Sequence, residues 1–147
     1  FHATGTGGTL GGLTAANKFI NDDIQVHGIN VSHKDDSYLK EVAELSTAAL
    51  NLLDIDFKLS DSDIIVDNNY VGEGYEIPST RANRAVKIFA ENEGVFLDPV
   101  YTGKAAAGMI DYLEKGKIEK GSDLLFWHTG GTNALFAEKK ILGNLLD

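Results

Sequence analysis

Cysteine is absent from the 147 residues of this chain, which excludes a disulfide framework and a thiolate metal site. Proline occurs only twice, and no apolar run approaches the roughly 18 residues that cross a bilayer. Basic residues are also scarce, because 13 lysines and arginines are outnumbered by 22 aspartates and glutamates, giving a net charge of −9. A surface of that sign argues against nucleic acids and anionic membranes as partners. Since no signal peptide is visible, we expect a cytoplasmic protein.

What is present indicates one globular α/β domain. The length suits a single domain with a sizeable core, and 43% hydrophobic against 24% charged residues is ordinary for a globular fold. Strands are predicted over residues 24–32, around 64–66, over 95–101 and over 123–128, and helices over 10–20, 37–53, 79–94, 103–114 and shortly after 132. This alternation predicts an open, twisted, mainly parallel sheet flanked by helices, with right-handed crossovers.

The helix predictions rest on apolar spacing and on end signals. In the first predicted helix the expected buried stripe is Leu10, Leu13, Ala16 and Ile20. Ser79 is a suitable N-cap for the third helix, and Gly94 is a suitable C-terminal stop. Residues 123–128 (DLLFWH) form a nearly continuous apolar run, which is typical of a buried parallel strand.

The most informative segment is residues 4–12, which read TGTGGTLGG and precede the first predicted helix. Glycines allow tight turns and a close approach of a ligand to the backbone, and successive N–H groups in such a turn form a nest for an anion. The helix N-terminus adds unpaired N–H groups and a positive dipole end. Thr6 and Thr9 offer hydroxyl donors, and Thr9 also suits the N-cap position. The segment therefore predicts a phosphate site.

Neither common nucleotide motif fits this glycine run. A dinucleotide fingerprint needs a third glycine where Leu10 stands, and no acidic residue closes a strand about 20 residues later. A P-loop needs Gly-Lys-Ser/Thr at its end, whereas Gly12 is followed by Leu13. A flexible loop without a ligand stays open as an alternative, although five glycines in nine residues exceed ordinary turn chemistry.

Two further segments follow predicted strands, Tyr101-Thr102-Gly103-Lys104 and His128-Thr129-Gly130-Gly131. Ligands of open α/β sheets bind beyond the carboxyl ends of the strands, so one crevice is predicted to hold both segments and the glycine run. His128 has no second histidine or carboxylate at ligand spacing, which favours a structural role over metal binding. No metal site is expected.

Four segments together resemble the D-cysteine desulfhydrases and the closely related 1-aminocyclopropane-1-carboxylate deaminases. They are the glycine run, residues 72–75 (GEGY) with Pro78, residues 97–105 (LDPVYTGKA) and residues 128–136 (HTGGTNALF), in the right order over essentially the whole chain. Both groups are pyridoxal-phosphate enzymes with the fold of the tryptophan synthase β-subunit. The resemblance implies pyridoxal 5'-phosphate as the cofactor and a small amino acid as the substrate.

The resemblance also assigns residues to the cofactor. Those expected to bind it are Gly5, Thr6, Gly7, Gly8 and Thr9 around the phosphate, Thr129 at the pyridine nitrogen, and Thr102. A hydroxyl rather than a carboxylate at the pyridine nitrogen leaves that nitrogen largely unprotonated, which suits β-elimination. The deaminases carry glutamate and leucine where this chain has Thr102 and Thr129, so both positions favour the desulfhydrases.

Two tyrosines are the catalytic residues that the resemblance implies. Tyr101 and Tyr75 are expected to line the substrate pocket, where one exchanges a proton or holds the substrate carboxylate. An unperturbed tyrosine has a pKa near 10, so a tyrosine base at neutral pH needs a nearby cation. Without the resemblance, Tyr101 reads as a strand-end tyrosine with a buried ring and a wet hydroxyl.

One essential residue of such enzymes is missing. Their cofactor forms a Schiff base with a lysine of the N-terminal half, and no lysine here has that context; Lys104 is expected to be structural. We therefore interpret residues 1–147 as the C-terminal part of the cofactor-binding catalytic domain, inactive alone and homodimeric as the intact enzyme. The implied reaction converts D-cysteine to pyruvate, ammonia and hydrogen sulfide. The alternatives are a sibling deaminase, a cysteate sulfo-lyase, or a non-catalytic phosphate-binding α/β domain.

Overall fold

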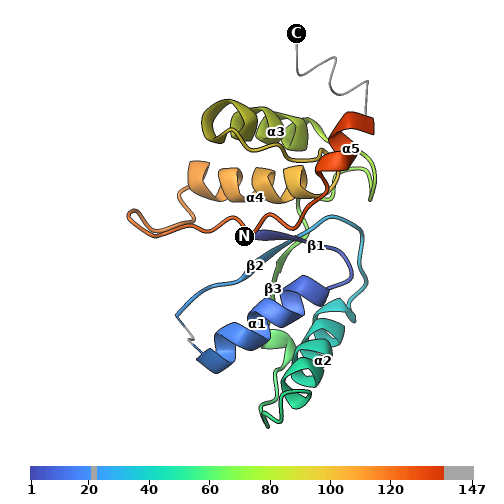
Figure 1. Ribbon diagram of the computed structural model, residues 1–147, viewed down its shortest axis with the longest axis vertical. Helices are drawn as coiled ribbons and strands as arrows, with labels where there is room; N and C mark the ends of the chain where they lie inside the picture. The colour runs from blue at the N-terminus through green and yellow to red at the C-terminus, as the bar shows by residue number, and fades with distance from the viewer. Residues whose placement is uncertain (21–22, 138–147) are drawn as a thin grey trace.

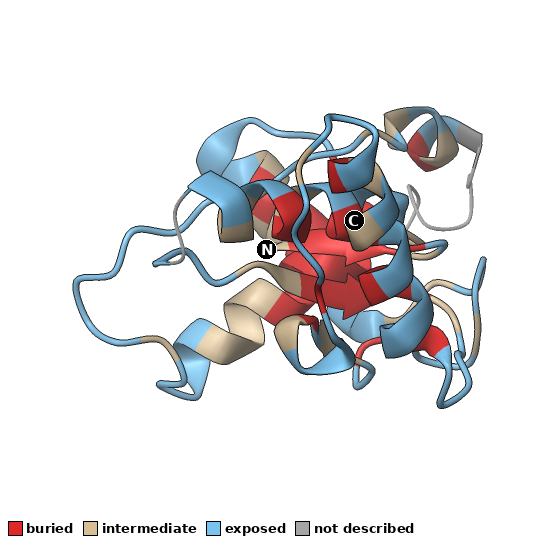
Figure 2. Cartoon of the chain, turned by 90° about the horizontal axis from the view of Figure 1, so that it is seen from below, coloured by how far each residue is buried: buried red, intermediate tan, exposed pale blue. Residues whose placement is uncertain are grey.

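A short parallel sheet forms the centre of the molecule. The computed structural model describes residues 1–20 and 23–137. The strands β1 (His2–Thr4), β2 (His27–Asn30) and β3 (Ile65–Asp67) lie side by side in that order and all run parallel. Their register pairs Thr4 with Asn30, so β1 and β2 end at the same edge of the sheet. Figure 2 shows this sheet as the buried middle of the chain.

Helices cover both faces of the sheet (Figure 1). The helices α1 (Gly8–Ile20) and α2 (Tyr38–Asn51) connect successive strands and pack together on one face. Two right-handed crossovers that step in the same direction across a sheet leave their helices on the same side, as observed. On the other face α4 (Thr102–Glu114) lies on β1 and β2, and α3 (Thr80–Glu93) packs outside α4. The short helices η1 (Asp61–Asp63) and α5 (Thr132–Ala137) complete the described elements.

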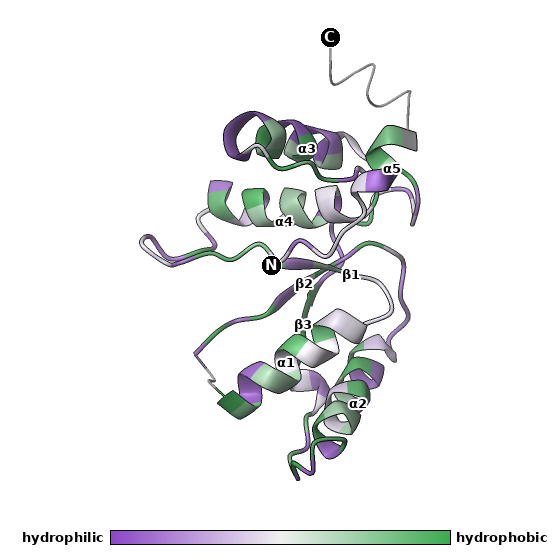
Figure 3. Cartoon of the chain, viewed as in Figure 1, coloured by the Kyte–Doolittle hydropathy of each residue, from purple (hydrophilic) through white to green (hydrophobic). Residues whose placement is uncertain are grey.

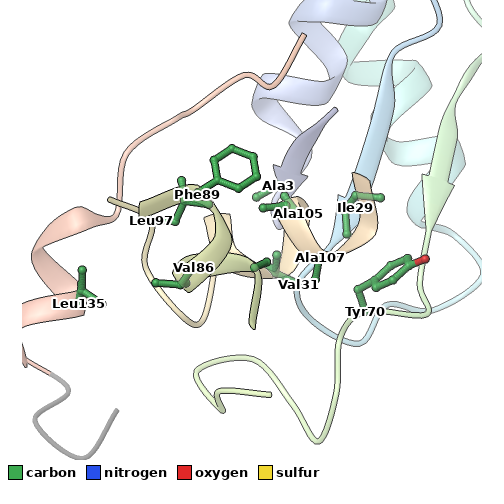
Figure 4. Close-up of a cluster of buried hydrophobic side chains, with 12 residues drawn as sticks. Ala3, Ile29, Val31, Tyr70, Val86, Phe89, Leu97, Ala105, Ala107 and Leu135 are labelled. Atoms are coloured by element: carbon green, nitrogen blue, oxygen red, sulfur yellow. The ribbon is translucent and has the colours of Figure 1, made fainter. Parts of the chain in front are cut away.

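Small residues explain how α4 approaches its neighbours so closely. Every residue from Thr102 to Gly108 is buried, and a Cβ at Gly108 would lie 2.7 Å from Ile29. Figure 3 shows that α4 carries fewer hydrophilic residues than the outer helix α3. The core on this face joins strand, α3 and α4 side chains, among them Ile29, Val86 and Ala105 (Figure 4). A second cluster around Leu10, Val42 and Leu50 lies on the face of α1 and α2.

Several predicted helix features are confirmed. The Ser79 hydroxyl accepts the Ala82 N–H at 3.2 Å and caps α3. Gly94 ends the same helix in the left-handed conformation, with φ of 65°. The stripe predicted for α1 holds for Leu10, which is buried, and in part for Leu13, which is half-buried; it is wrong for Ala16 and Ile20, which are exposed. The buried positions of α1 are Leu10, Gly11, Thr14 and Ala15, since this face packs on α2 as well as on the sheet.

The strand predicted over residues 95–101 is wrong. Its residues 95–98 are extended without a ladder, and residues 99–101 form a turn. The cause is local, because the Asp98 carboxylate accepts the backbone N–H groups of Val100 and Tyr101 and so curls the chain toward α4. Pro99 in addition has no N–H to give to a ladder.

The buried strand predicted over residues 123–128 is also wrong. This segment makes two backbone hydrogen bonds beside β1, from Phe1 to Leu125 and from Trp127 to Phe1, each 2.8 Å. Leu125 is 66% exposed and Trp127 is 47% exposed. A single bridged residue is too little for a strand, and no described element covers these side chains.

The remaining strand predictions hold with shorter bounds, and β1 was not anticipated. Only residues 27–30 of the predicted 24–32 form β2, and β3 lies one residue later than predicted. The class of fold, an open parallel sheet flanked by helices, is confirmed. Among the described helices none is both long and apolar enough to cross a membrane.

Candidate functional site

The glycine run forms a tight loop between the end of β1 and the start of α1. Gly7 adopts φ of +89°, and a Cβ there would lie 2.7 Å from Val42 of α2. The Gly7 carbonyl accepts the Gly11 N–H at 2.7 Å and so begins the hydrogen bonding of α1. A side chain at position 7 would therefore strain the backbone and collide with α2, which explains the glycine.

The loop presents unpaired backbone donors. Within residues 1–20 and 23–137, no hydrogen bond to protein is donated by the N–H groups of residues 6–10. Thr6, Gly8 and Thr9 are exposed, so their N–H groups stand at the surface of a helix N-terminus, whereas Gly7 and Leu10 are buried. The prediction that Thr9 caps α1 is wrong, because the helix already begins at Gly8. Unpaired N–H groups with a positive dipole end behind them form an anion site.

Tyr38, which the sequence did not single out, lies on the buried side of the glycine loop beside Thr4 and Gly7. The Tyr38 hydroxyl lies 2.7 Å from the Thr4 hydroxyl, and both side chains are buried. A Cβ at Gly7 would stand 3.6 Å from the same hydroxyl oxygen. The parallel pairing of β1 and β2 brings the segment after β2 beside the segment after β1, which places Tyr38 near this loop.

Tyr101 lies against the loop from the other side. A Cβ at Gly5 would stand 3.8 Å from the Tyr101 ring, and the Tyr101 hydroxyl donates a long hydrogen bond of 3.4 Å to the Ala3 carbonyl. Burial raises the pKa of Tyr101, and the hydroxyls of Tyr75 and Tyr38 raise it further. The hydroxyl therefore holds its proton at neutral pH and serves as a hydrogen-bond donor.

Tyr75 lies in the loop between β3 and α3 and is 52% exposed. It is close enough to Tyr101 to affect the pKa of that residue. Lys104 of α4 reaches into this loop, where its ammonium donates to the carbonyls of Val71 at 2.8 Å and Gly74 at 2.6 Å. The expected structural role of Lys104 is confirmed by these two bonds.

The Asp98 carboxylate organises the segment that carries Tyr101. It is fully buried and accepts the N–H groups of Val100, Tyr101 and Thr102 at 3.0, 2.6 and 2.7 Å. It also accepts the Thr102 hydroxyl at 2.6 Å. The Thr102 hydroxyl is thus buried and donates to protein, so in this structure it lies behind the loop surface rather than on it.

The second glycine turn packs on the same carboxylate. Gly131 has φ of +95°, and a Cβ there would lie 2.5 Å from an Asp98 oxygen. His128 stabilises the turn, because its Nδ1 accepts the Gly130 N–H at 3.0 Å and its Nε2 then donates to the Phe96 carbonyl at 3.2 Å. Thr129 lies between these residues and is exposed.

Three segments distant in sequence therefore meet at one edge of the sheet. A Cβ at Gly5 would lie 3.8 Å from the Tyr101 ring and a Cβ at Gly131 would lie 2.5 Å from an Asp98 oxygen, which brings the two glycine turns near opposite ends of residues 98–101. The three segments expected to share one crevice thus lie near one another, and the crevice itself stays a prediction. Its donor set of main-chain N–H groups and neutral hydroxyls suits a phosphate ester with a polar ring. Among the described residues, no group of three or more histidines or carboxylates is arranged to hold a metal.

Comparisons with known proteins agree with this arrangement. A family model described as pyridoxal-phosphate dependent enzyme matches residues 1–130. Two proteins named D-cysteine desulfhydrase, from two strains of Klebsiella pneumoniae, are each 38% identical over 135 residues, covering 92% of this chain and 40% of theirs. A crystal structure described as an ACC deaminase homologue superposes with a TM-score of 0.84 at 32% identity, covering 98% of this chain and 42% of that one. The chain thus spans about two fifths of the length of these relatives.

Proposed function

The chain belongs to the family of pyridoxal-phosphate-dependent enzymes, and we propose that it is the C-terminal part of the catalytic domain of a longer D-cysteine desulfhydrase. The reaction would break the Cβ–S bond of D-cysteine, consume one water and yield pyruvate, ammonia and hydrogen sulfide. The observation that carries the proposal is the meeting of the Gly5 loop, the Tyr101 segment and the Gly131 turn at one edge of the sheet.

The cofactor of this family is pyridoxal 5'-phosphate. The unpaired N–H groups of residues 6–10 would hold its phosphate, because main-chain donors at a helix N-terminus favour an anion. Thr129, exposed beside the Gly131 turn, would donate to the pyridine nitrogen. When bound, the cofactor supplies the electron sink that makes the Cα proton of an amino acid acidic.

The protein residues would orient the substrate and manage protons. Tyr101 stays protonated because its pKa is raised, so its O–H would donate to the substrate carboxylate or to the departing sulfur. Tyr75, which lies near enough to affect the pKa of Tyr101, would also line the substrate pocket. Thr102 would act indirectly, by holding the segment that carries Tyr101 through its bond to Asp98.

Sibling activities remain the alternatives, and Thr102 and Thr129 bear on them. The Thr102 hydroxyl donates to Asp98 in this chain, whereas the deaminases carry glutamate at this position and leucine at position 129. Threonine at both positions therefore favours the desulfhydrase over the deaminase. A cysteate sulfo-lyase differs in its leaving group. An assay of 2-oxo acid release separates these activities, because D-cysteine, L-cysteine and cysteate would give pyruvate whereas 1-aminocyclopropane-1-carboxylate would give 2-oxobutanoate.

Two substitutions in the complete enzyme test the residue roles. Tyr101→Phe should lower turnover while the cofactor absorbance stays intact, because the hydroxyl is lost and the ring remains. Thr129→Val should shift the cofactor spectrum or weaken cofactor binding. Unchanged turnover in the first variant, or an unaltered spectrum and affinity in the second, would contradict the assigned role.

The state of the complete protein belongs to the same proposal. We expect a cytoplasmic homodimer whose N-terminal half supplies the lysine that carries the cofactor. Retention of cofactor absorbance by the complete protein after desalting, and its loss when that lysine is replaced, would support the enzyme over a non-catalytic phosphate-binding domain. A sedimentation measurement gives the oligomeric state directly.

A further inference from the structure

We propose that Lys104 is a positioning residue for Tyr75, holding the loop of residues 71–75 that carries this tyrosine. The inference rests on the proposed function, because it assigns a part to Lys104 in the same pocket. It goes beyond the structural role expected from the sequence, since it makes the placement of a substrate-facing side chain depend on one buried ammonium.

The ammonium of Lys104 binds the loop at two points. Its side chain is fully buried, and Nζ donates to the Val71 carbonyl at 2.8 Å and to the Gly74 carbonyl at 2.6 Å. These carbonyls lie three residues apart, on either side of the turn at Gly72, where φ is +71°. Tyr75 follows directly after Gly74, so the second bond fixes the backbone next to its Cα.

No other polar contact ties this loop to the rest of the described chain. For residues 71–78, the only other hydrogen bond among residues 1–20 and 23–137 is internal, from the Ile77 N–H to the Tyr75 carbonyl. Val71 is buried at the start of the loop, whereas Glu73, Tyr75 and Glu76 are exposed, so apolar packing does not fix these three residues. Loops with exposed backbones and few buried contacts open easily. Beyond Val71, the two Lys104 bonds are therefore the main restraint on where Tyr75 stands.

The backbone beside Lys104 is also held in place, as its ammonium is. Its neighbour Gly103 donates its N–H to the Asp98 carbonyl at 2.7 Å, and a Cβ at position 103 would lie 2.5 Å from that oxygen. Asp98 also holds the Tyr101 N–H at 2.6 Å. One short segment thus sets the positions of both tyrosines, Tyr101 directly and Tyr75 through the Lys104 side chain.

The need to fill a buried space does not by itself explain why position 104 is a lysine. A charged side chain is rarely buried completely, because leaving water is costly for the charge. Burial accordingly lowers the pKa of Lys104, although Asp98 opposes that effect. Methionine would fill a similar volume without this cost. What methionine lacks is a donor for the two carbonyls, and those carbonyls belong to the loop that carries Tyr75.

The test is a double-mutant cycle in the complete enzyme, with Lys104→Met, Tyr75→Phe and the pair combined. Lys104→Met should lower kcat/KM by about 10- to 100-fold, as expected when a reacting group is displaced by about 1 Å. In the Tyr75→Phe background the same change should cost much less, because the hydroxyl it positions is already gone. The exposed Lys87→Met on α3 serves as the matched control and should leave kcat/KM unchanged.

Hydrogen exchange gives a readout that does not depend on turnover. Lys104→Met should speed amide exchange in residues 71–78 and leave the exchange of residues 5–12 unchanged. Equal losses in both backgrounds, or unchanged exchange in residues 71–78, would overturn the proposal. If wild type releases no 2-oxo acid from any amino acid tested, the proposed function fails, and the exchange measurement still decides whether Lys104 holds the loop.

A second variant, Lys104→Ala, provides the test if the Lys104→Met protein does not fold. Lys104→Ala removes the side chain beyond Cβ, and propylammonium has the size and the charge to replace it. Added propylammonium should restore part of kcat/KM and slow the exchange of residues 71–78, with no effect on wild type. Absence of both effects would count against the inference.

Discussion

Substituting Gly7 should test the glycine loop most sharply. In Gly7→Ala the new side chain would sit at φ of +89° and its Cβ would lie 2.7 Å from Val42. A left-handed conformation costs roughly 1–2 kcal/mol for a residue with a Cβ. The overlap with α2 adds about 1–3 kcal/mol, as in other overpacked sites. The reduced entropy of the unfolded alanine variant returns about 0.4–1 kcal/mol.

We therefore expect Gly7→Ala to lower the free energy of unfolding by about 1–5 kcal/mol. The matched control is Gly12→Ala on the same helix, because a Cβ at Gly12 meets nothing within 4 Å and its φ is not positive. Alanine in a helix interior is favoured over glycine by about 0.8–1 kcal/mol, so Gly12→Ala should stabilise the protein slightly. The two alanine variants should thus move in opposite directions.

The assay is denaturant unfolding of the cofactor-free complete protein, followed by titration with pyridoxal phosphate. Gly7→Ala should also weaken cofactor binding, because relief of the overlap with Val42 displaces the N–H groups of residues 6–10. Gly12→Ala should bind the cofactor like wild type. If Gly7→Ala is as stable as Gly12→Ala and binds the cofactor equally well, the geometry assigned to the loop is wrong.

Two further substitutions have equally definite outcomes. Tyr38→Phe leaves the buried Thr4 hydroxyl without its partner and should lower the free energy of unfolding by about 1–3 kcal/mol. Adding Thr4→Val should recover most of that loss. A double variant as unstable as the single one would contradict this account. The Lys115 ammonium and the Tyr70 hydroxyl hold the pKa of Asp111 below its usual 3.8, so its stabilising contribution is present above that pH and is lost as the pH falls through the lower folded-state value. Asp111→Asn should therefore flatten the acid limb of a stability-against-pH curve, and an unchanged acid limb would refute the assignment.

The sequence predicted best where local chemistry decides the conformation. Ser79 and Gly94 bound α3 as predicted, because capping depends on neighbouring backbone groups and not on distant contacts. The glycine loop before α1 was anticipated for the same reason. Its detail was not, since the start of α1 at Gly8 follows from packing of Gly7 on Val42 of another helix.

Tertiary contacts explain where the prediction failed. Residues 95–101 are apolar enough for a strand, yet the Asp98 carboxylate satisfies the N–H groups that a strand would have given to a neighbour. Side chains that cap their own backbone compete with sheet pairing, and apolar spacing does not register this. Tyr38 was missed because nothing in its local sequence indicates that its hydroxyl reaches Thr4, 34 residues away.

The buried Asp98 carboxylate has a consequence for exchanging parts between related enzymes. It binds the turn before α4 through three N–H groups and leaves no room for a side chain at Gly131. The two segments therefore have to be exchanged together. A chimaera that takes residues 97–104 from one relative and residues 128–132 from another would combine segments whose packing at Asp98 and Gly131 is not matched. The loop of residues 71–78 contacts this unit through Lys104 alone among its polar contacts in the described chain, which makes it the segment to vary when new substrates are sought.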